Sequence, residues 1–156
     1  MKRLPTWLEI NLDILDQNLE RIQQHVGREV SILLTVKADA YGHGAVQVAR
    51  AAASRVRMFG VATVDEGTEL REAGIKNEIL ILSPILEPEI AAVARHQLAI
   101  TISSSDMALA VTREAGGAVV DAHVEVDTGM GRTGVAEDEA FDEIKRVAAA
   151  PGVRLR

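Results

Sequence analysis

Residues 30–36 read VSILLTV, an apolar run rich in β-branched side chains. The run is too short for a buried helix and lacks polar alternation, which predicts a strand buried on both faces, as in a parallel sheet. Residues 37–44 are polar and predict a turn, and the Ala- and Val-rich residues 45–56 predict a helix. Strand, loop and helix in this order form one unit of a parallel α/β fold.

The same order recurs along the rest of the chain. Before the first unit, residues 7–12 alternate in polarity and predict a short strand, and Asp13 is placed to cap a helix that Gly27 ends. After it, strands are predicted over 58–64, 78–82, 98–102 and 118–126, and the helices that follow them over 66–73, 88–96, 105–115 and 137–149, with 153–155 beginning one more strand.

Two layouts of such a parallel sheet compete, an open doubly wound sheet and an eight-stranded barrel. No G-x-G-x-x-G motif follows the first buried strand, which weakens the dinucleotide-binding version of the open sheet. Five strand–helix units and the start of a sixth strand favour a partial (β/α)8 barrel of the TIM type.

Composition excludes several classes of protein. The 156 residues are 47% hydrophobic and 26% charged, which is typical of one globular domain or a piece of a larger one. A net charge of −6 and only 3% aromatic residues argue against nucleic acid and anionic membranes as partners. There is no cysteine, hence no thiolate nucleophile, and no metal site is predicted. Residues 1–7 hold two cations without a following apolar stretch, so we expect no signal peptide and a cytoplasmic protein.

The segment over residues 36–44, VKADAYGHG, places Lys37 where a buried strand gives way to a loop. Active sites of parallel α/β proteins lie at the carboxyl ends of their strands. Burial lowers the pKa of an amine, and a neutral amine can attack an aldehyde, so Lys37 suits a Schiff base. A lone lysine here would more often simply enter solvent. Tyr41, the single tyrosine, and two glycines that flank His43 favour a ligand site instead.

The segment over residues 123–134, HVEVDTGMGRTG, is the second candidate. Strand alternation predicts that His123, Glu125 and Asp127 share one face, which points to the barrel interior. Arg132 ends a glycine-rich loop and offers a bidentate fork for a carboxylate. The plainer alternative is a glycine-rich connection with a surface arginine. For Asp127 a structural role, accepting backbone N–H groups of this loop, ranks above proton transfer.

Other polar segments are interpreted structurally. Ser105 is expected to cap the helix over 105–115. Asp65 and Glu66 open a helix, where the helix dipole favours acids. The acidic residues 137–139 are expected to form the solvated first turn of the last helix.

Together these segments resemble motifs of the alanine racemase family, barrel-type enzymes that depend on pyridoxal 5′-phosphate (PLP). VKADAYGHG is similar to the family's cofactor-lysine motif, and VDTGMGRTG to its arginine-loop motif. The opening TWLEINLD, followed by a helix, also resembles the family's amino terminus. Order and separation agree along the chain, so the resemblance covers essentially all 156 residues.

The resemblance implies interconversion of L- and D-alanine through a PLP external aldimine and an α-carbanion, supplying D-alanine for cell-wall synthesis. Lys37 would form the internal aldimine and serve as one of two proton-transfer bases. Tyr41 would contact the cofactor's phosphate region, and Arg132 its phenolic oxygen and the substrate carboxylate. His123, Glu125 and Asp127 would support the site, while the second base would be a tyrosine from a partner subunit, which implies a homodimer.

One position departs from the family pattern. Many members carry a lysine, often carbamylated, at the position of Glu125. We hypothesise that the Glu125 carboxylate supplies the same negative charge and pairs with Arg132, directly or through water.

A complete barrel needs roughly 200 residues or more, so we expect residues 1–156 to be a truncated N-terminal barrel domain. In the family a β-rich domain follows, with which the strand at 7–12 would pair. We therefore expect little racemase activity and weak PLP affinity from this chain alone. A purified 156-residue chain that interconverts L- and D-alanine at enzyme-like rates would overturn this expectation, and the DNA downstream of codon 156 tests the expected truncation.

Three alternatives remain open at the level of sequence. The chain could be a non-catalytic PLP-binding module, or a racemase acting on serine or a basic amino acid. It could also be an open α/β domain without PLP, in which case borohydride and PLP would not label Lys37 preferentially.

Overall fold

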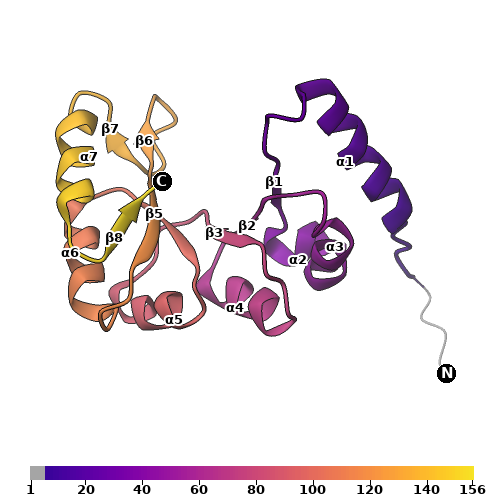
Figure 1. The fold of residues 1–156 in the computed structure, drawn as a ribbon, viewed down its shortest axis with the longest axis horizontal. Coiled ribbons are helices and arrows are strands. Elements are labelled where there is room, and N and C mark those ends of the chain that lie inside the picture. The colour runs from indigo at the N-terminus through magenta and orange to yellow at the C-terminus, as the bar shows by residue number, and fades with distance from the viewer. Residues whose placement is uncertain (1–5) are drawn as a thin grey trace.

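A parallel sheet with consecutive strand order organises the molecule. The computed structural model describes residues 6–156 and contains a six-stranded sheet of order β1-β2-β3-β4-β5-β8, every neighbouring pair parallel (Figure 1). These strands are Leu33–Thr35, Met58–Val61, Glu78–Ile81, Ala99–Ile102, Val120–Val124 and Val153–Leu155. A doubly wound sheet would reverse its order partway, whereas a barrel adds strands in one direction. The partial-barrel prediction is therefore confirmed.

The helices that connect the strands lie along one side of the sheet (Figure 1). Helix α1 instead packs against α3 at the edge of the fold. The helices are α1 Leu12–Val26, α2 Lys37–Gly42, α3 Ala45–Ala52, α4 Val64–Glu72, α5 Ile90–Arg95, α6 Ser105–Glu114 and α7 Ala140–Ala149, and a short 3₁₀ turn, η1 Glu87–Glu89, precedes α5.

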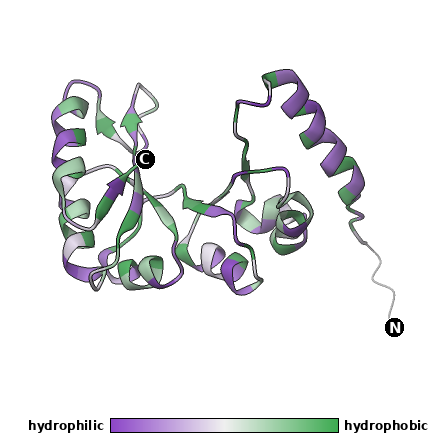
Figure 2. Ribbon diagram, viewed as in Figure 1, coloured by the Kyte–Doolittle hydropathy of each residue, from purple (hydrophilic) through white to green (hydrophobic). Residues whose placement is uncertain are grey.

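The hydrophobic core lies between the sheet and the helices. Strands are predominantly hydrophobic, while α1 is largely hydrophilic (Figure 2). Alternate strand residues face the helices and are almost completely buried, among them Phe59, Val61, Ile79, Ile81, Ile100 and Ile102. The intervening residues face the other side, where Thr101 of β4 lies beside His123 of β5, and Asp121 of β5 beside Arg154 of β8. This second face, the inner face, carries the polar side chains.

The amino-terminal prediction is wrong about the helix cap, while the pairing of residues 7–12 with a following β-rich domain stays a prediction. Residues 6–11 form no strand, and Asn11 rather than Asp13 caps α1, its Oδ1 accepting hydrogen bonds from the backbone of Asp13 and Ile14 at 3.0 Å each. Alternating polarity alone does not make a strand, because the backbone needs a partner strand. Residues 1–5, which hold both cations of the signal-peptide prediction, lie outside the described residues.

Three further boundaries also differ from prediction. Ser104, not Ser105, caps α6 by accepting a hydrogen bond from the Met107 backbone at 3.3 Å. The strand predicted over 118–126 leaves the sheet after Val124, and β6 Val126–Asp127 pairs instead with β7 Val135–Ala136 in a separate sheet. Residues 137–139 form a turn before α7 rather than its first turn.

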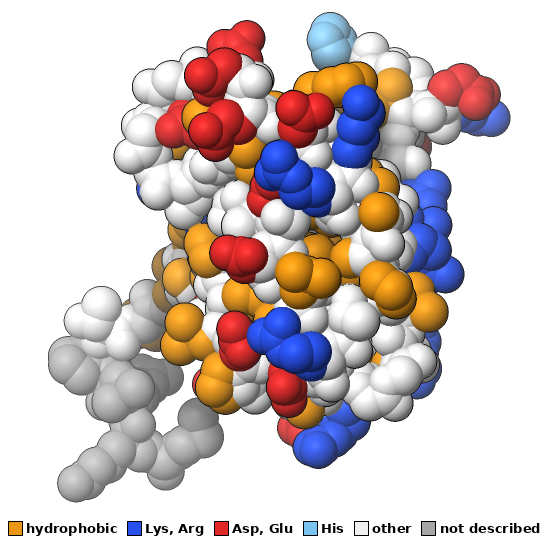
Figure 3. All heavy atoms as spheres, turned by 90° about the vertical axis from the view of Figure 1, so that its left-hand side faces the viewer, with side chains coloured by type: hydrophobic (Ala, Val, Ile, Leu, Met, Phe, Trp, Pro, Cys, Tyr) orange, Lys and Arg blue, Asp and Glu red, His pale blue; other side chains and the backbone are white. Residues whose placement is uncertain are grey.

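Helices α6 and α7 are joined by a carboxylate. Glu143 of α7 accepts a hydrogen bond from the backbone N–H of Ser105 and lies 2.6 Å from Nη1 of Arg146. The Ser105 N–H, together with Arg146, holds the pKa of Glu143 below its usual range. On this side of the molecule hydrophobic and charged side chains intermingle (Figure 3). No helix of residues 6–156 is both long and apolar enough to cross a bilayer.

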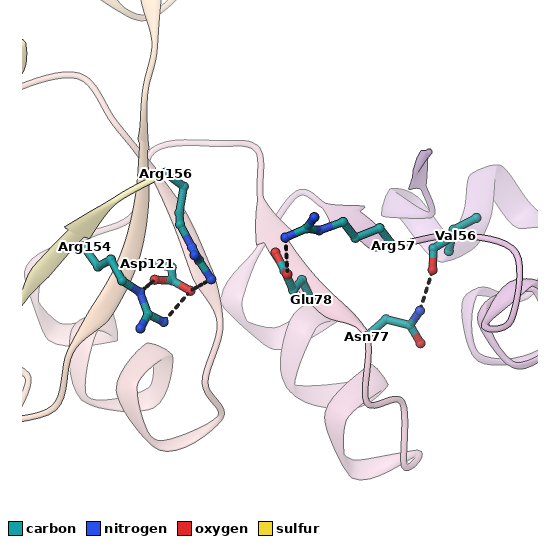
Figure 4. A network of polar contacts seen from close by, with 7 residues as sticks. All are labelled: Val56, Arg57, Asn77, Glu78, Asp121, Arg154 and Arg156. Atoms are coloured by element: carbon teal, nitrogen blue, oxygen red, sulfur yellow. Dashed lines mark hydrogen bonds and ion pairs between the residues drawn. The ribbon is translucent and has the colours of Figure 1, made fainter. Parts of the chain in front are cut away.

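A charged cluster crosses the inner face near the amino ends of the strands (Figure 4). Asp121 receives two hydrogen bonds from Arg154, one of 2.9 Å, and Arg156 lies 3.3 Å from the same carboxylate. Arg57, which directly precedes β2, forms an ion pair at 3.2 Å with Glu78, the first residue of β3. The hydrogen bond from Arg154 is the main reason that the pKa of Asp121 lies below its usual value.

Asp121→Asn is expected to lower the free energy of unfolding by about 1 kcal/mol near neutral pH. Because the folded-state pKa is lowered, the ionised carboxyl stabilises the fold above its ordinary pKa of 3.8, and this contribution is lost as the pH falls through the folded value. Urea unfolding of both proteins from pH 7 to about pH 3 should show converging stabilities. Arg154 is 56% exposed, so added salt should also reduce the difference in unfolding free energy between the two proteins. A pH-independent difference would contradict the charge assignment.

Candidate active site

The segment after Lys37 has an unusual backbone. Residues Ala38, Asp39, Ala40 and Tyr41 have φ between 51° and 56°, so α2 contains a left-handed turn instead of the polar turn predicted. Each such non-glycine residue costs about 1–2 kcal/mol and persists only where surrounding contacts determine the conformation. The Asp39 carboxylate supplies one contact, accepting a hydrogen bond from the Ala45 backbone at 2.7 Å. The backbone next to Lys37 is therefore held in a conformation that costs folding stability.

Lys37 and Arg132 line one cleft. Its volume is about 500 Å³, and it lies where β1, β3, β4 and β5 end, beside the last part of the loop between β6 and β7. The remaining lining residues are Leu82, Ser83, Pro84, Thr101, Val124, Glu125 and Thr133. Lys37 is half-buried and Arg132 exposed. The cleft therefore combines an amine, a guanidinium and several hydroxyls at the carboxyl edge of the sheet, where barrel enzymes place their chemistry.

Glu125 also lines this cleft, but a different residue is its partner. One carboxylate oxygen accepts a hydrogen bond from the hydroxyl of Thr133 at 2.6 Å. Among the ion pairs of residues 6–156 there is none between Glu125 and Arg132, so the predicted direct pair is not formed. Thr133 directly follows Arg132, and Glu125 thus contacts the arginine loop through its neighbour.

Asp127 organises the glycine loop that presents Arg132. Its Oδ1 accepts hydrogen bonds from the backbone N–H groups of Gly129 and Gly131 at 2.9 and 3.0 Å, and Oδ2 accepts a further one from Gly131 at 2.9 Å. The N–H groups of Gly131 and Gly129 hold the pKa of the Asp127 carboxyl below its usual range. This geometry confirms the structural interpretation of Asp127. Asp127 lies in β6, whereas His123 lies in β5, which ends at Val124.

Three predicted site residues are outside the cleft lining, namely Tyr41, His123 and Asp127. Tyr41 is 63% exposed on α2. His123 lies on the inner face beside Thr101, which does line the cleft. Its Nε2 atom is buried and has no hydrogen-bond partner among residues 6–156. The structure therefore brings together Lys37, Glu125 and Arg132, and places His123 next to a residue of the same cleft.

Sequence reasoning missed several residues near Lys37. The end of β3 contributes Leu82 to Pro84, and β4 contributes Thr101. The rule that strand carboxyl ends carry the site could have identified them once the strand ends were known. Glu66 was interpreted only as an acid at a helix start, yet it also accepts a hydrogen bond from the backbone of Ala38 at 2.8 Å. No sequence pattern indicates a contact between residues so far apart.

A second hollow lies at the opposite end of the sheet. Its volume is about 610 Å³, and Arg71, Asn77, Asp121 and Arg154 are among its lining residues. The Arg71 guanidinium there donates to four backbone carbonyl oxygens, at 2.7 to 3.1 Å, and thus has a structural role. No group of three or more His, Asp or Glu side chains within the described part of the chain is arranged to hold a metal ion.

Comparisons with known proteins are consistent with one another on the family. The family model described as alanine racemase, N-terminal domain, matches residues 10–156. An alanine racemase from Streptococcus equi subsp. zooepidemicus is 39% identical over 152 residues, which cover 97% of this chain and 42% of that protein. The chain thus spans about two fifths of the length of this curated relative.

Solved structures show the same likeness. Alanine racemase of Clostridium difficile 630 in complex with cycloserine superposes with a TM-score of 0.94 and 33% identity, covering 100% of this chain and 44% of that one. A histidine racemase from Leuconostoc mesenteroides gives a TM-score of 0.82 and 25% identity, covering 91% of this chain and 39% of that one. On the evidence of the family match and the shared fold, the chain belongs to the alanine racemase family and corresponds to its N-terminal domain.

Proposed function

We propose that the protein is a PLP-dependent alanine racemase, and that residues 1–156 supply its cofactor lysine and its arginine loop. One observation carries the proposal: Lys37 and Arg132, from loops far apart in the sequence, line the same cleft at the carboxyl edge of the sheet. Family membership favours alanine as substrate, while the activity and the cytoplasmic homodimer of the whole protein remain part of the proposal.

The residues of the cleft fit PLP. A primary amine suits an aldehyde, and the guanidinium of Arg132 suits an anionic oxygen of the cofactor. The volume of about 500 Å³ lies within the range of small-molecule sites. The phosphate contact proposed for Tyr41 has no such support, because that side chain lies outside the cleft lining.

When bound, PLP acts as an electron sink that makes the α-proton of the amino acid acidic. In this proposal the Lys37 amine holds the cofactor and moves the α-proton on one face. Arg132 binds the substrate carboxylate, and Glu125 orients the arginine loop through Thr133. Racemisation also requires a second base on the opposite face. We propose that a partner subunit contributes this base, as the family resemblance implies.

The proposed activity predicts that the protein encoded by the complete gene, incubated with PLP and L-alanine in D2O, forms D-alanine carrying deuterium at the α-carbon. Chiral chromatography with mass spectrometry measures both. The 156-residue chain alone should show PLP labelling at Lys37 after borohydride but little conversion. Binding by the complete protein without α-deuterium exchange would favour a non-catalytic PLP-binding module instead.

The histidine racemase likeness supports a second candidate, a racemase for another amino acid. The same D2O experiment with serine, histidine and lysine distinguishes it from the first. A kcat/KM for one of these that exceeds the value for alanine would replace alanine as the substrate while leaving the roles of Lys37 and Arg132 unchanged.

A further inference from the structure

Glu66 connects two strand ends at the candidate site. It lies half-buried in the first turn of α4, where Thr63 caps the helix. Its Oε1 accepts a hydrogen bond from the backbone N–H of Ala38 at 2.8 Å, and its Oε2 accepts one from the backbone N–H of Ala62 at 2.7 Å. Ala38 directly follows Lys37, and Ala62 directly follows β2. The Glu66 carboxylate thus connects the backbone just after β1 to the backbone just after β2.

The contact falls where the backbone most needs support. Ala38 is the first of the four left-handed residues. Most other hydrogen bonds of this turn come from its own neighbourhood, such as Ala40 N–H to Val36 O at 2.8 Å. Glu66 comes from a different β/α unit and accepts at the first residue of the turn. A charge-assisted hydrogen bond is stronger than a neutral one, so the contact can offset part of the left-handed cost.

Helix capping alone does not account for this arrangement. Asp65 shares the first turn of α4 and satisfies the same preference for an acid, yet it is exposed. Among the described residues, no side-chain hydrogen bond connects Asp65 to another element, whereas both oxygens of Glu66 are used. The preference for acids at helix starts therefore explains the residue type at position 66 but not its two partners.

We propose that Glu66 is a positioning residue for Lys37: it fixes the amide after the lysine to the end of β2 and so determines where the amine lies in the cleft. This inference rests on the proposed function in one respect, that the Lys37 amine is the group that meets PLP. The hydrogen bonds themselves can be tested without the cofactor.

Glu66→Gln in the 156-residue chain is the decisive variant. The amide keeps the size of the side chain but has one oxygen, so its NH2 group must face one of the two backbone N–H donors. Hydrogen exchange at Ala38 or Ala62 should accelerate about tenfold or more, the effect of losing one charge-assisted hydrogen bond. Asp65→Asn and Glu69→Gln, which change exposed acids of the same helix, should leave both amides protected.

The second readout is the position of the amine. With PLP and borohydride, the wild-type chain should label Lys37 ahead of Lys76 and Lys145, and Glu66→Gln should lose that preference. Faster exchange with unchanged labelling would overturn the positioning role, and unchanged exchange would overturn the double contact. A wild-type chain that shows no preference for Lys37 would instead contradict the proposed function.

A measurement on the wild-type chain covers the case in which Glu66→Gln fails to fold. If one carboxylate accepts from both amides, through-hydrogen-bond NMR couplings should join the amide nitrogens of Ala38 and Ala62 to the same carboxyl carbon, that of Glu66. Coupling of only one of the two amides to Glu66, or of neither while the chain stays folded, would refute the proposal.

Discussion

Replacing Lys37 by alanine is expected to reduce the racemase activity proposed for the whole protein by roughly a thousandfold or more, because the variant would lose both the amine that holds the cofactor and a proton-transfer base. The visible absorbance of cofactor bound to the protein should disappear together with the activity. The measurement combines that absorbance, peptide mapping after borohydride reduction, and the rate of D-alanine formation. Lys37 is the half-buried amine of the cleft that it shares with Arg132, which is why this residue is the one chosen.

Two further variants test whether the Lys37 amine itself is required, rather than a cation at position 37 or a lysine elsewhere. Lys37→Arg keeps a cation but replaces the nucleophilic amine by a guanidinium that stays protonated, so it should be as inactive as the alanine variant. Lys76→Ala removes an exposed lysine near the hollow at the opposite end of the sheet and should leave activity unchanged. Lys37→Ala with near-normal turnover would exclude Lys37 from the chemistry.

The periodicity of the sequence was sufficient to predict the main architecture. Runs such as residues 30–36 and 98–102 have the composition of strands buried on both faces, and the structure places strands within both. Glycines also marked helix ends, since α1 ends at Val26, before Gly27 with its φ of 90°. Apolar composition and backbone freedom are local properties of a residue, which is why sequence alone reports them well. Burial depends on neighbours, and β1, which lies at the edge of the sheet with Leu33 exposed, is not buried on both faces as predicted.

What sequence reasoning missed depends on contacts between distant residues. The left-handed turn after Lys37 consists of ordinary residue types, and only contacts such as that of Glu66 with Ala38 make it stable. Asn11 rather than Asp13 caps α1 because Asn11 is the extended residue that directly precedes the helix. The negative charge of Glu125 predicted Arg132 as its partner, but in the folded chain its carboxylate accepts a hydrogen bond from Thr133. Such pairings require the folded chain and have no local signature.

Gly134→Ala is expected to lower the free energy of unfolding by about 2–4 kcal/mol and to displace the arginine loop. A β-carbon at this position would lie 2.7 Å from the backbone nitrogen of Asp127 and 3.0 Å from the carbonyl carbon of Val126. These are backbone atoms of β6, which is paired with β7, so they have little room to move. Separation of the two strands would carry Arg132 away from the cleft, and the KM for alanine in the complete protein should rise.

Gly129→Ala provides the matched control for this prediction. Gly129 has a φ of 122°, close to the 110° of Gly134, but nothing lies within 4 Å of a β-carbon there. Both substitutions therefore carry the strain of a positive φ, about 1–2 kcal/mol, and only Gly134→Ala adds a collision with backbone. Urea unfolding of the two variants should give clearly unequal losses. Equal losses would mean that the positive φ alone requires glycine at position 134, and that close packing of the Arg132 loop on β6 contributes nothing.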